Sequence, residues 1–320
     1  MTWQPNATIE TLKKRSDVVR SIREFFYEKN VLEVETPSLS QATVTDVHLH
    51  TFDTQFIGPG YANGQRLYLQ TSPEFHMKRL LCAGSGAIFQ ISKSFRNEES
   101  GRYHNPEFTM LEWYQPHYDH LELINEVDEL LQRVLKTESC DVKTYQQVFL
   151  EHIGLDPLIN NIEQVREVAL RYELGDFVVT ETNIDTLLQC LFCFVIEPLI
   201  GLDRPIAIYN FPASQAALAK LDDDNRVAQR FEFYYQGIEL ANGFHELQDA
   251  QEQLSRFEHD NIIREKEGLQ PQPIDQHLID ALTHGLPNCA GVALGIDRLI
   301  MLAINKQHIN QVISFDVNRC

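Results

Sequence analysis

The sequence predicts an α+β fold, because amphipathic helical segments alternate with strand-like runs and one pair of runs forms an antiparallel hairpin. Residues 8–30 and 119–134 carry apolar side chains at helical spacing. Residues 88–91 and 108–111 are apolar and β-prone, and the polar stretch between them predicts a long hairpin loop. With 320 residues, of which 43% are hydrophobic, the chain has ample material for a large core.

The first elements are a helix and a short strand. The helix of residues 8–30 is predicted to end at Asn30, a residue type that tolerates the left-handed conformation. Residues 31–36 follow as a strand ended by Pro37. Residues 67–70 predict a further strand.

A helix is predicted to begin directly after that strand. Ser72 is expected as its N-cap, Pro73 at its first position and Glu74 in its first turn. This pattern alone indicates no more than a well-capped helix.

The hairpin carries the residues of greatest chemical interest. Phe108, Met110, Glu112 and Tyr114 have the same parity on the return strand, so they face one side of the sheet. Arg96 ends the first strand, where its planar fork suits a phosphate group. The alternative is a surface ion pair between an arginine and a glutamate two residues apart.

The middle of the chain is mostly helical. Asp119 opens one helix with a capping box, and Thr144 opens a shorter one that ends at Gly154. Residues 155–205 are predicted as a mostly helical insertion. Its Cys190-x-x-Cys193 is expected on a buried helix face, because no second ligand pair for zinc follows.

Residues 231–246 predict aromatic strands that carry two carboxylates, Glu239 and Glu246. Carboxylates can hold Mg²⁺, which bridges phosphates. The odd separation of the two would place them on opposite faces of a straight strand. Either Asn242 and Gly243 make a two-residue hairpin, or Gly243 marks a β-bulge that redirects one side chain.

Residues 291–299 predict a strand that runs into a helix at Leu299. The simplest interpretation makes Asp297 the helix cap. Arg298 would then lie in the first turn, where a cation opposes the helix dipole, and this unfavourable placement suggests another role. Gly295 would let the backbone approach a ligand closely.

Composition limits the function. The 27 basic and 46 acidic residues give a net charge of −19, which disfavours a broad nucleic-acid surface and leaves room only for a local basic pocket. The N-terminal residues lack the apolar segment of a signal peptide, so we expect a cytoplasmic protein. Six scattered cysteines predict reduced thiols.

Three segments together resemble the motifs of class II aminoacyl-tRNA synthetases, and within them the lysyl enzyme. F-R-N-E at 95–98 with H-N-P-E-F-T-M-L-E-W-Y at 104–114 resembles motif 2. The helix, strand and Pro37 resemble motif 1, and G-x-x-x-G-x-D-R-L at 291–299 resembles motif 3. The resemblance implies one α+β catalytic domain over residues 1–320, with a mainly antiparallel sheet flanked by helices, the insertion at about 155–205, and a homodimer.

The resemblance also implies an ATP- and Mg²⁺-dependent enzyme. It forms an aminoacyl adenylate of lysine or (R)-β-lysine, and in the branch without an N-terminal anticodon-binding barrel it transfers the acyl group to a lysine of elongation factor P. No stable binding of tRNA is expected. Alternatives are a truncated enzyme that charges tRNA, an amidoligase that binds aspartate, and a non-catalytic sensor subunit.

Residue roles follow from the matching motif positions. Arg96 would hold the α-phosphate, Arg298 the γ-phosphate, and Phe108 would stack on adenine. Glu239 and Glu246 would bind Mg²⁺. The segment around them resembles G-x-E-x-x-N-G-F-x-E-L of the lysyl enzymes, and this resemblance favours the bulge over the hairpin. The remaining ATP contacts are Asn97, Glu98, His104, Asn105, Leu240 and Gly295. The substrate contacts are Ser72, Pro73, Glu74, Glu112, Tyr114, Asn242, Glu246 and Ala293, of which Glu112 and Tyr114 would receive the distal ammonium.

Two positions depart from the lysyl pattern. Tyr103 stands where the lysyl enzymes have arginine, and Arg102 lies one place earlier, so either of these or His104 could contact the outer phosphates. Ala293 stands where glycine is expected, and it adds a methyl group to the floor of the amino-acid pocket.

Overall fold

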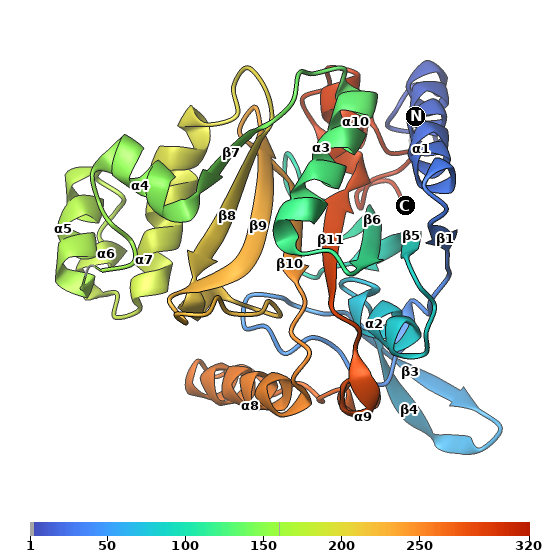
Figure 1. Ribbon diagram of the computed structural model, residues 1–320. Coiled ribbons are helices and arrows are strands. Elements are labelled where there is room, and N and C mark those ends of the chain that lie inside the picture. Colours follow the sequence, from blue (N-terminus) through green and yellow to red (C-terminus); the bar gives the residue numbers. More distant parts are fainter. Residues whose placement is uncertain (1–2, 160) are drawn as a thin grey trace. The chain divides into compact units, whose positions relative to one another are not determined.

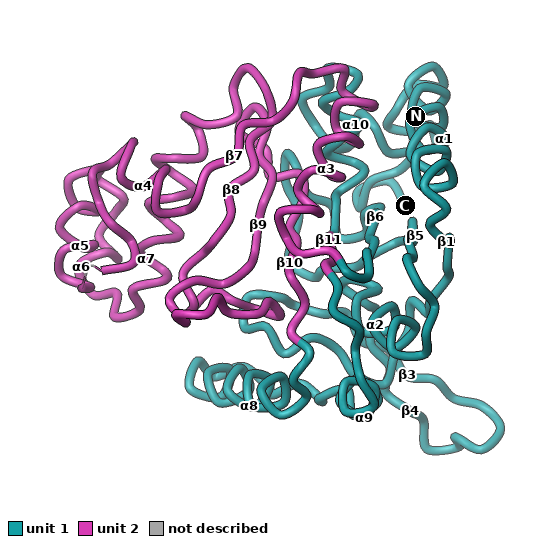
Figure 2. Tube along the Cα trace, viewed as in Figure 1, with its two compact units in different colours: residues 1–117, 248–289, 293–320 teal, residues 118–247, 290–292 magenta. Residues whose placement is uncertain are grey.

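The computed structural model describes residues 3–159 and 161–320, which form two compact units (Figure 2). Unit 1 comprises Met1–His117, Gln248–Cys289 and Ala293–Cys320, and unit 2 comprises Tyr118–Leu247 and Ala290–Val292. Strand β11 (Cys289–Gly295) is divided between them. Both units combine helices with mainly antiparallel strands, so the predicted α+β fold class is confirmed. The description of the chain as one catalytic domain with an insertion stays a prediction.

Unit 1 contains two groups of paired strands and five α-helices in its described residues. The strands are β1 (Leu32–Glu33), β2 (Leu39–Ser40), β3 (Asp53–Gly58), β4 (Tyr61–Leu69), β5 (Ile88–Phe95) and β6 (Glu107–Pro116). The helices are α1 (Ile9–Glu28), α2 (Glu74–Cys82), α8 (Ala250–Lys266), α9 (Gln276–Gly285) and α10 (Ile296–Ala303), with a 3₁₀ turn η4 (Ile309–Gln311). The order is β1-β5-β6 in one group and β2-β4-β3 in the other, whose β3–β4 hairpin projects from the rest of the unit (Figure 1). Among these described strand pairs, β1 and β5 run parallel and the others run antiparallel.

The first predicted helix is confirmed, and its end is set by local chemistry. The Thr8 side chain caps α1 by accepting a hydrogen bond from the Thr11 backbone N–H at 3.1 Å. Asn30, just beyond the helix, has the expected left-handed conformation with a φ of 58°. The strand that follows is shorter than predicted, since only Leu32 and Glu33 pair with a neighbour.

Two predicted helix starts were wrong in detail. Helix α2 begins at Glu74 with Pro73 as its N-cap, one residue later than predicted. The Ser72 hydroxyl still accepts from the Glu74 N–H at 3.0 Å, as a capping side chain does, and it donates its own hydrogen to Glu112. Helix α10 begins at Ile296 after the N-cap Gly295, so Asp297 is not a cap. Its carboxylate instead bonds to residues distant in the sequence.

Unit 2 contains four paired strands and, in its described residues, five α-helices. The strands are β7 (Asp141–Thr144), β8 (Ile206–Pro212), β9 (Val227–Tyr235) and β10 (Ile238–His245), in the order β10-β9-β8-β7. The helices are α3 (His120–Leu135), α4 (Tyr145–Ile153), α5 (Ile162–Arg171), α6 (Phe177–Thr180) and α7 (Ile184–Leu191), followed by η1 (Phe192–Ile196), η2 (Glu197–Leu199) and η3 (Ala213–Gln215). The capping boxes at Asp119 and Thr144 are confirmed, as is the left-handed Gly154.

Helices α4 to α7 gather beyond the β7–β8 edge (Figure 1) and enclose a core of their own. Leu187, Leu188 and Leu191 form the buried face of α7. The prediction that Cys190 and Cys193 share that face was wrong, since Cys190 is half-buried and Cys193 is exposed. All six cysteines, each within the described ranges, are free thiols, as predicted. No helix in residues 3–159 and 161–320 is long and apolar enough to span a bilayer.

Candidate functional site

The β5–β6 hairpin presents a buried carboxylate on the face that the sequence predicts. The two strands pair in regular antiparallel register from Ile88 opposite Tyr114 to Phe95 opposite Glu107. Glu112, only 2% exposed, accepts hydrogen bonds from the Ser72 hydroxyl at 2.6 Å and the Tyr114 hydroxyl at 2.7 Å. These two hydroxyl donors are neutral and favour the charged form of the carboxylate, and a buried carboxylate is a group that can receive a cationic ligand.

Glu74 lies in the first turn of α2, and its own carboxylate has a cationic partner. Lys78, one turn later and 1% exposed, places its Nζ 2.7 Å from Glu74 Oε1. The predicted contact of Glu74 with a substrate amine stays a prediction, and Lys78 would share the carboxylate with that amine. Sequence reasoning missed Lys78, although its spacing of four residues from Glu74 is the usual signal for a helical ion pair.

The loop end of the hairpin brings together two residues predicted to hold ATP. The Arg96 guanidinium carbon lies 5.3 Å from the centre of the Phe108 ring, and its Nη1 lies 3.6 Å from Glu99 Oε1. Asn97 donates its backbone N–H to the His50 carbonyl at 2.8 Å, and Glu98 has a left-handed φ of 68°. A non-glycine residue in this conformation is uncommon and is often found at a functional site.

Asn105 closes the same loop against the C-terminal segment. Its side-chain Nδ2 donates to the Glu107 carbonyl at 2.7 Å, and its Oδ1 accepts from the Val317 backbone N–H at 3.0 Å. The side-chain amide of Asn105 therefore bonds to the backbone of Glu107 through its nitrogen and to the backbone of Val317 through its oxygen. The predicted contact between Asn105 and adenine stays a prediction.

The structure separates the three candidates for the outer phosphates. His104 Nε2 lies 2.6 Å from Arg298 Nη2, so these two residues are neighbours. Arg102 instead donates to the carbonyl and side chain of Gln307 at 2.9 and 2.6 Å. Tyr103 contributes its carbonyl, 3.4 Å from Arg298 Nε. His104 is therefore the side chain of the three that lies beside the motif 3 arginine.

Ala293 and Gly295 share the half-buried side of β11, whereas Leu294 between them is fully buried. The three atoms nearest to a Cβ added to Gly295 all belong to the Arg298 side chain, at 3.7–3.9 Å, which is ordinary van der Waals contact. Gly295 therefore lies beside the residue predicted to bind the γ-phosphate. The added methyl of Ala293 projects from the accessible side of the strand.

In unit 2, a β-bulge puts Glu239 and Asn242 on one face of β10, and Glu246 follows directly after the strand. Glu239 pairs with Tyr234 of β9, but Ala241 pairs with Phe233, so Leu240 is the extra residue. Beyond the bulge the alternation places Asn242 on the Glu239 side, and continuing it brings Glu246 to the same side. Leu240 is buried, so any contact with ATP would come from its backbone.

The bulge was predicted at Gly243, and that position was wrong. Asn242 and Gly243 lie inside one continuous strand, which also excludes the hairpin alternative. A Cβ on Gly243 would come within 2.3 Å of the Phe231 ring and 2.9 Å of the Gly291 carbonyl oxygen. Gly243 is therefore required for close packing between strands.

A buried charge network surrounds these residues, and sequence reasoning missed it. The Glu232 carboxylate accepts hydrogen bonds from the side chains of Arg230 and Tyr234, and from the Asn242 side chain at 2.9 Å. Burial raises the pKa of the Glu232 carboxyl, and the Glu239 carboxylate raises it further, although Arg230 lowers it. Burial alone would lower the pKa of Arg230, but the Glu232 carboxylate raises it. Arg230, Glu232 and Tyr234 alternate along a predicted strand and so share one face, and this pattern could have indicated the network.

The donor set fits Mg²⁺ held partly by phosphate. Glu239 carries hard carboxylate oxygens on the same face as Glu232, whose own oxygens already accept from Arg230, Asn242 and Tyr234. No three His, Cys, Asp or Glu side chains in the described part of the chain form a metal-binding group.

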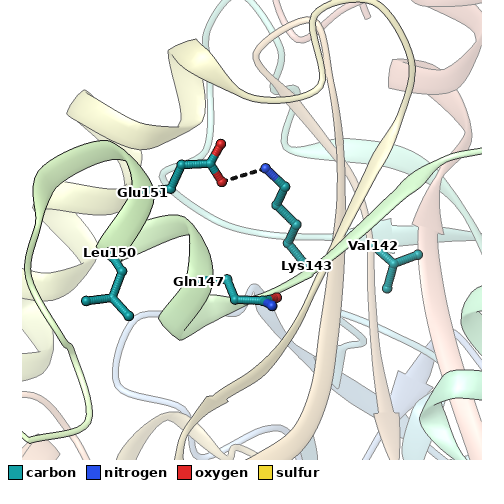
Figure 3. A pocket seen from close by; sticks show the side chains of 5 residues that line it. All are labelled: Val142, Lys143, Gln147, Leu150 and Glu151. Carbon is teal, nitrogen blue, oxygen red and sulfur yellow. Dashed lines mark hydrogen bonds and ion pairs between the residues drawn. The ribbon is translucent and has the colours of Figure 1, made fainter.

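A groove of 570 Å³ lies elsewhere in unit 2 and contains none of the predicted site residues (Figure 3). It is lined by Val142, Lys143, Gln147, Leu150 and Glu151. Lys143 and Glu151 form an exposed ion pair across it at 2.6 Å.

Comparison with known proteins found one family model and several relatives that span nearly the whole chain. The family model described as class II tRNA synthetases (D, K and N) matches residues 1–319. An elongation factor P (R)-beta-lysine ligase of Photobacterium profundum is 62% identical over 317 residues, which cover 99% of this chain and 98% of that protein. Proteins of the same name from Vibrio atlanticus and Edwardsiella ictaluri are 60% and 59% identical over 319 residues, again covering at least 98% of both chains.

Proposed function

The chain belongs to the class II tRNA synthetase family (D, K and N), and from this premise we propose that it is an ATP-dependent, AMP-forming ligase. It activates (R)-β-lysine, or lysine, and transfers the acyl group to a lysine ε-amine of elongation factor P. Relatives of that name match the chain over nearly its full length. The geometric observation that carries the proposal is Glu112, a buried carboxylate held by two hydroxyls and suited to the distal ammonium of the substrate.

The reaction has two balanced steps. In the first, the carboxylate of β-lysine attacks the α-phosphorus of ATP, an O–P bond forms and the bond to the leaving pyrophosphate breaks. In the second, the acceptor ε-amine attacks the adenylate carbonyl, the amide forms, and AMP and a proton are released. Both steps need positioning and charge stabilisation more than a strong general base.

Each group of site residues has a role in this scheme. Arg96 stabilises charge at the α-phosphate, and Arg298 with His104 binds the outer phosphates. Phe108 stacks on adenine, whose polar edge meets Glu98 and Asn105. Glu239 and Glu246 would hold Mg²⁺ in the pattern of the family, and the ion would offset phosphate charge.

The remaining proposals concern the setting of the enzyme. We propose that it acts as a homodimer in the cytoplasm, as one catalytic domain with a helical insertion at about 155–205. The ammonium-binding arrangement at Glu112 argues against an amidoligase for aspartate. The retained arginines and carboxylates argue against a non-catalytic sensor.

The test of the proposed function is ATP–pyrophosphate exchange over a panel of amino acids, followed by intact-mass measurement of elongation factor P. We expect exchange with β-lysine above all and a single mass increase of one β-lysyl group. Exchange with aspartate, or charging of tRNA without modification of the protein, would reject the proposal.

We predict no stable complex with tRNA at physiological salt. A net charge of −19 opposes the release of counterions that drives binding to the phosphate backbone. Filter binding at several salt concentrations measures this, with a lysyl-tRNA synthetase as positive control. Submicromolar binding that weakens steeply with salt would contradict the prediction.

We predict that Ala293→Gly raises activity with α-lysine relative to β-lysine. The Ala293 methyl lies on the half-buried side of β11, where it would crowd an α-amine but tolerate an amine on the β-carbon. One methyl-scale change in a tight pocket shifts preference by about tenfold or more. The readout is the ratio of the two kcat/KM values.

The control for this substitution is Ala290→Gly, which removes a fully buried methyl from the same strand. That change tests whether loosening of the strand alone alters specificity, since Gly increases the entropy of the unfolded chain at either position. Equal ratios for the wild type and Ala293→Gly would assign the preference to other residues.

A further inference from the structure

Within unit 1, one arginine of α1 joins the strand of motif 2 to the helix of motif 3. Arg15 Nη1 lies 2.5 Å from Asp297 Oδ1, and the two residues are 282 positions apart. The other terminal nitrogen of the Arg15 guanidinium, Nη2, donates to the Thr109 hydroxyl at 2.9 Å. The other carboxylate oxygen of Asp297 accepts from the Thr109 backbone N–H at 2.7 Å. The three residues therefore form a closed ring of hydrogen bonds.

The ring is shielded from water, so its geometry is well defined. The side chain of Asp297 is 2% exposed and that of Arg15 is 17% exposed. Charge-assisted bonds are strongest in such surroundings, and a buried carboxylate without its partner is costly. A lysine could not replace Arg15, because a single ammonium cannot reproduce the planar fork that spans two acceptors.

Each end of the ring lies one residue from a group proposed to hold ATP. Asp297 precedes Arg298 in the first turn of α10, and Thr109 follows Phe108 in β6. The ring thus fixes the distance between the backbone of Phe108 and that of Arg298. These two residues would bind opposite ends of the nucleotide.

We infer that Arg15 is a positioning residue for ATP. It touches no substrate, and it acts by holding Asp297 and Thr109 so that Arg298 and Phe108 are preorganised for the outer phosphates and the adenine ring. The inference rests on the proposed function and adds to it a residue of the motif 1 helix, which carries none of the proposed ATP contacts. It also makes α1 part of the ATP-binding apparatus.

The test is the effect of Arg15→Lys on the two Michaelis constants in ATP–pyrophosphate exchange. We expect the KM for ATP to rise about tenfold, the scale set by loss of a hydrogen bond between charged groups. The KM for β-lysine should not change. A purely structural role would lower the amount of active enzyme and leave both KM values as in the wild type, and that result would overturn the inference.

Arg20→Lys is the matched control, since Arg20 lies on the same helix and pairs with Asp17 on the surface, where both are about two-thirds exposed. It should leave the KM for ATP unchanged. Should Arg15→Lys prove unstable, Asp297→Asn removes the charge from the other side of the ring while preserving its shape. The same rise in the KM for ATP is expected, and its absence would equally reject the role of the ring.

Chemical rescue adds a second readout. Arg15 lines an open groove of 460 Å³ together with Leu12, Ser16, Val19, Arg20, Arg23 and Ser314. Guanidinium at low concentration should therefore enter Arg15→Ala and lower its KM for ATP, whereas sodium at equal ionic strength should not. Equal effects of the two salts would contradict the inference.

Direct titration of ATP, without amino acid, separates this inference from the proposed function. If the wild type binds ATP but none of the amino acids tested supports pyrophosphate exchange, the proposed function fails. The role of Arg15 is then still tested by the affinity of its variants for ATP. If Arg15→Lys binds ATP as tightly as the wild type, the inference fails whatever the reaction.

Discussion

Arg298→Ala is expected to reduce ATP–pyrophosphate exchange by about 10²–10³-fold, the usual cost of removing one preorganised group that stabilises developing charge. Arg298 lies beside His104 on the accessible side of α10, and its cationic fork suits the outer phosphates. The fold should survive, because the guanidinium lies against the His104 ring and the Tyr103 carbonyl rather than in the hydrophobic core. Pre-steady-state formation of the adenylate, measured with labelled ATP, gives the rate of the affected step.

Arg102→Ala is the matched control. The fork of Arg102 is occupied by the carbonyl and side chain of Gln307, so its removal should lower exchange far less than removal of Arg298 does. Arg96→Ala, in contrast, should be as damaging as Arg298→Ala, since Arg96 is assigned to the α-phosphate. Normal adenylate formation by Arg96→Ala or Arg298→Ala would reject the assignment of that arginine.

Glu112→Gln is expected to lower kcat/KM for β-lysine by about 10–100-fold, since a hydrogen bond to a charged group contributes roughly 1.5–3 kcal/mol. The amide keeps the shape of the side chain and removes the negative charge that would receive the distal ammonium. Binding of ATP should not change. The measurement is exchange at varied β-lysine, repeated with an analogue that lacks the distal amine.

Tyr114→Phe is the control for this second prediction, because it removes one hydroxyl donor and leaves the carboxylate charged. Its effect should be smaller than that of Glu112→Gln. The discrimination between β-lysine and the analogue should collapse only in Glu112→Gln. If that discrimination persists, the ammonium is recognised by another group.

Local features of the fold could be predicted from the sequence because their causes lie within a few residues. The capping boxes at Asp119 and Thr144 and the left-handed Asn30 depend on neighbouring backbone groups. The shared face of Glu112 and Tyr114 follows from the period of a strand alone. These predictions needed no knowledge of tertiary structure.

Features that depend on distant partners could not be predicted in this way. Asp297 was expected to cap a helix, but Arg15, 282 residues away, takes its carboxylate. The bulge was expected at Gly243, since glycine often marks one, whereas the extra residue is Leu240, whose side chain gives no such signal. In both cases packing between separate segments decides the outcome.

The bulge at Leu240 has a consequence for how mutational data on this protein are interpreted. The position of Glu239 depends on the number of residues in β10, because one extra residue sets which side of the strand each later residue faces. A scan of single substitutions would record at Leu240 only the loss of a buried side chain. Deletion of the same residue would restore a regular ladder in which Glu239 and Asn242, then two positions apart, still face one side. Comparison of this deletion with a substitution at Leu240 therefore separates the role of the buried side chain from that of the bulge, which a substitution scan alone cannot do.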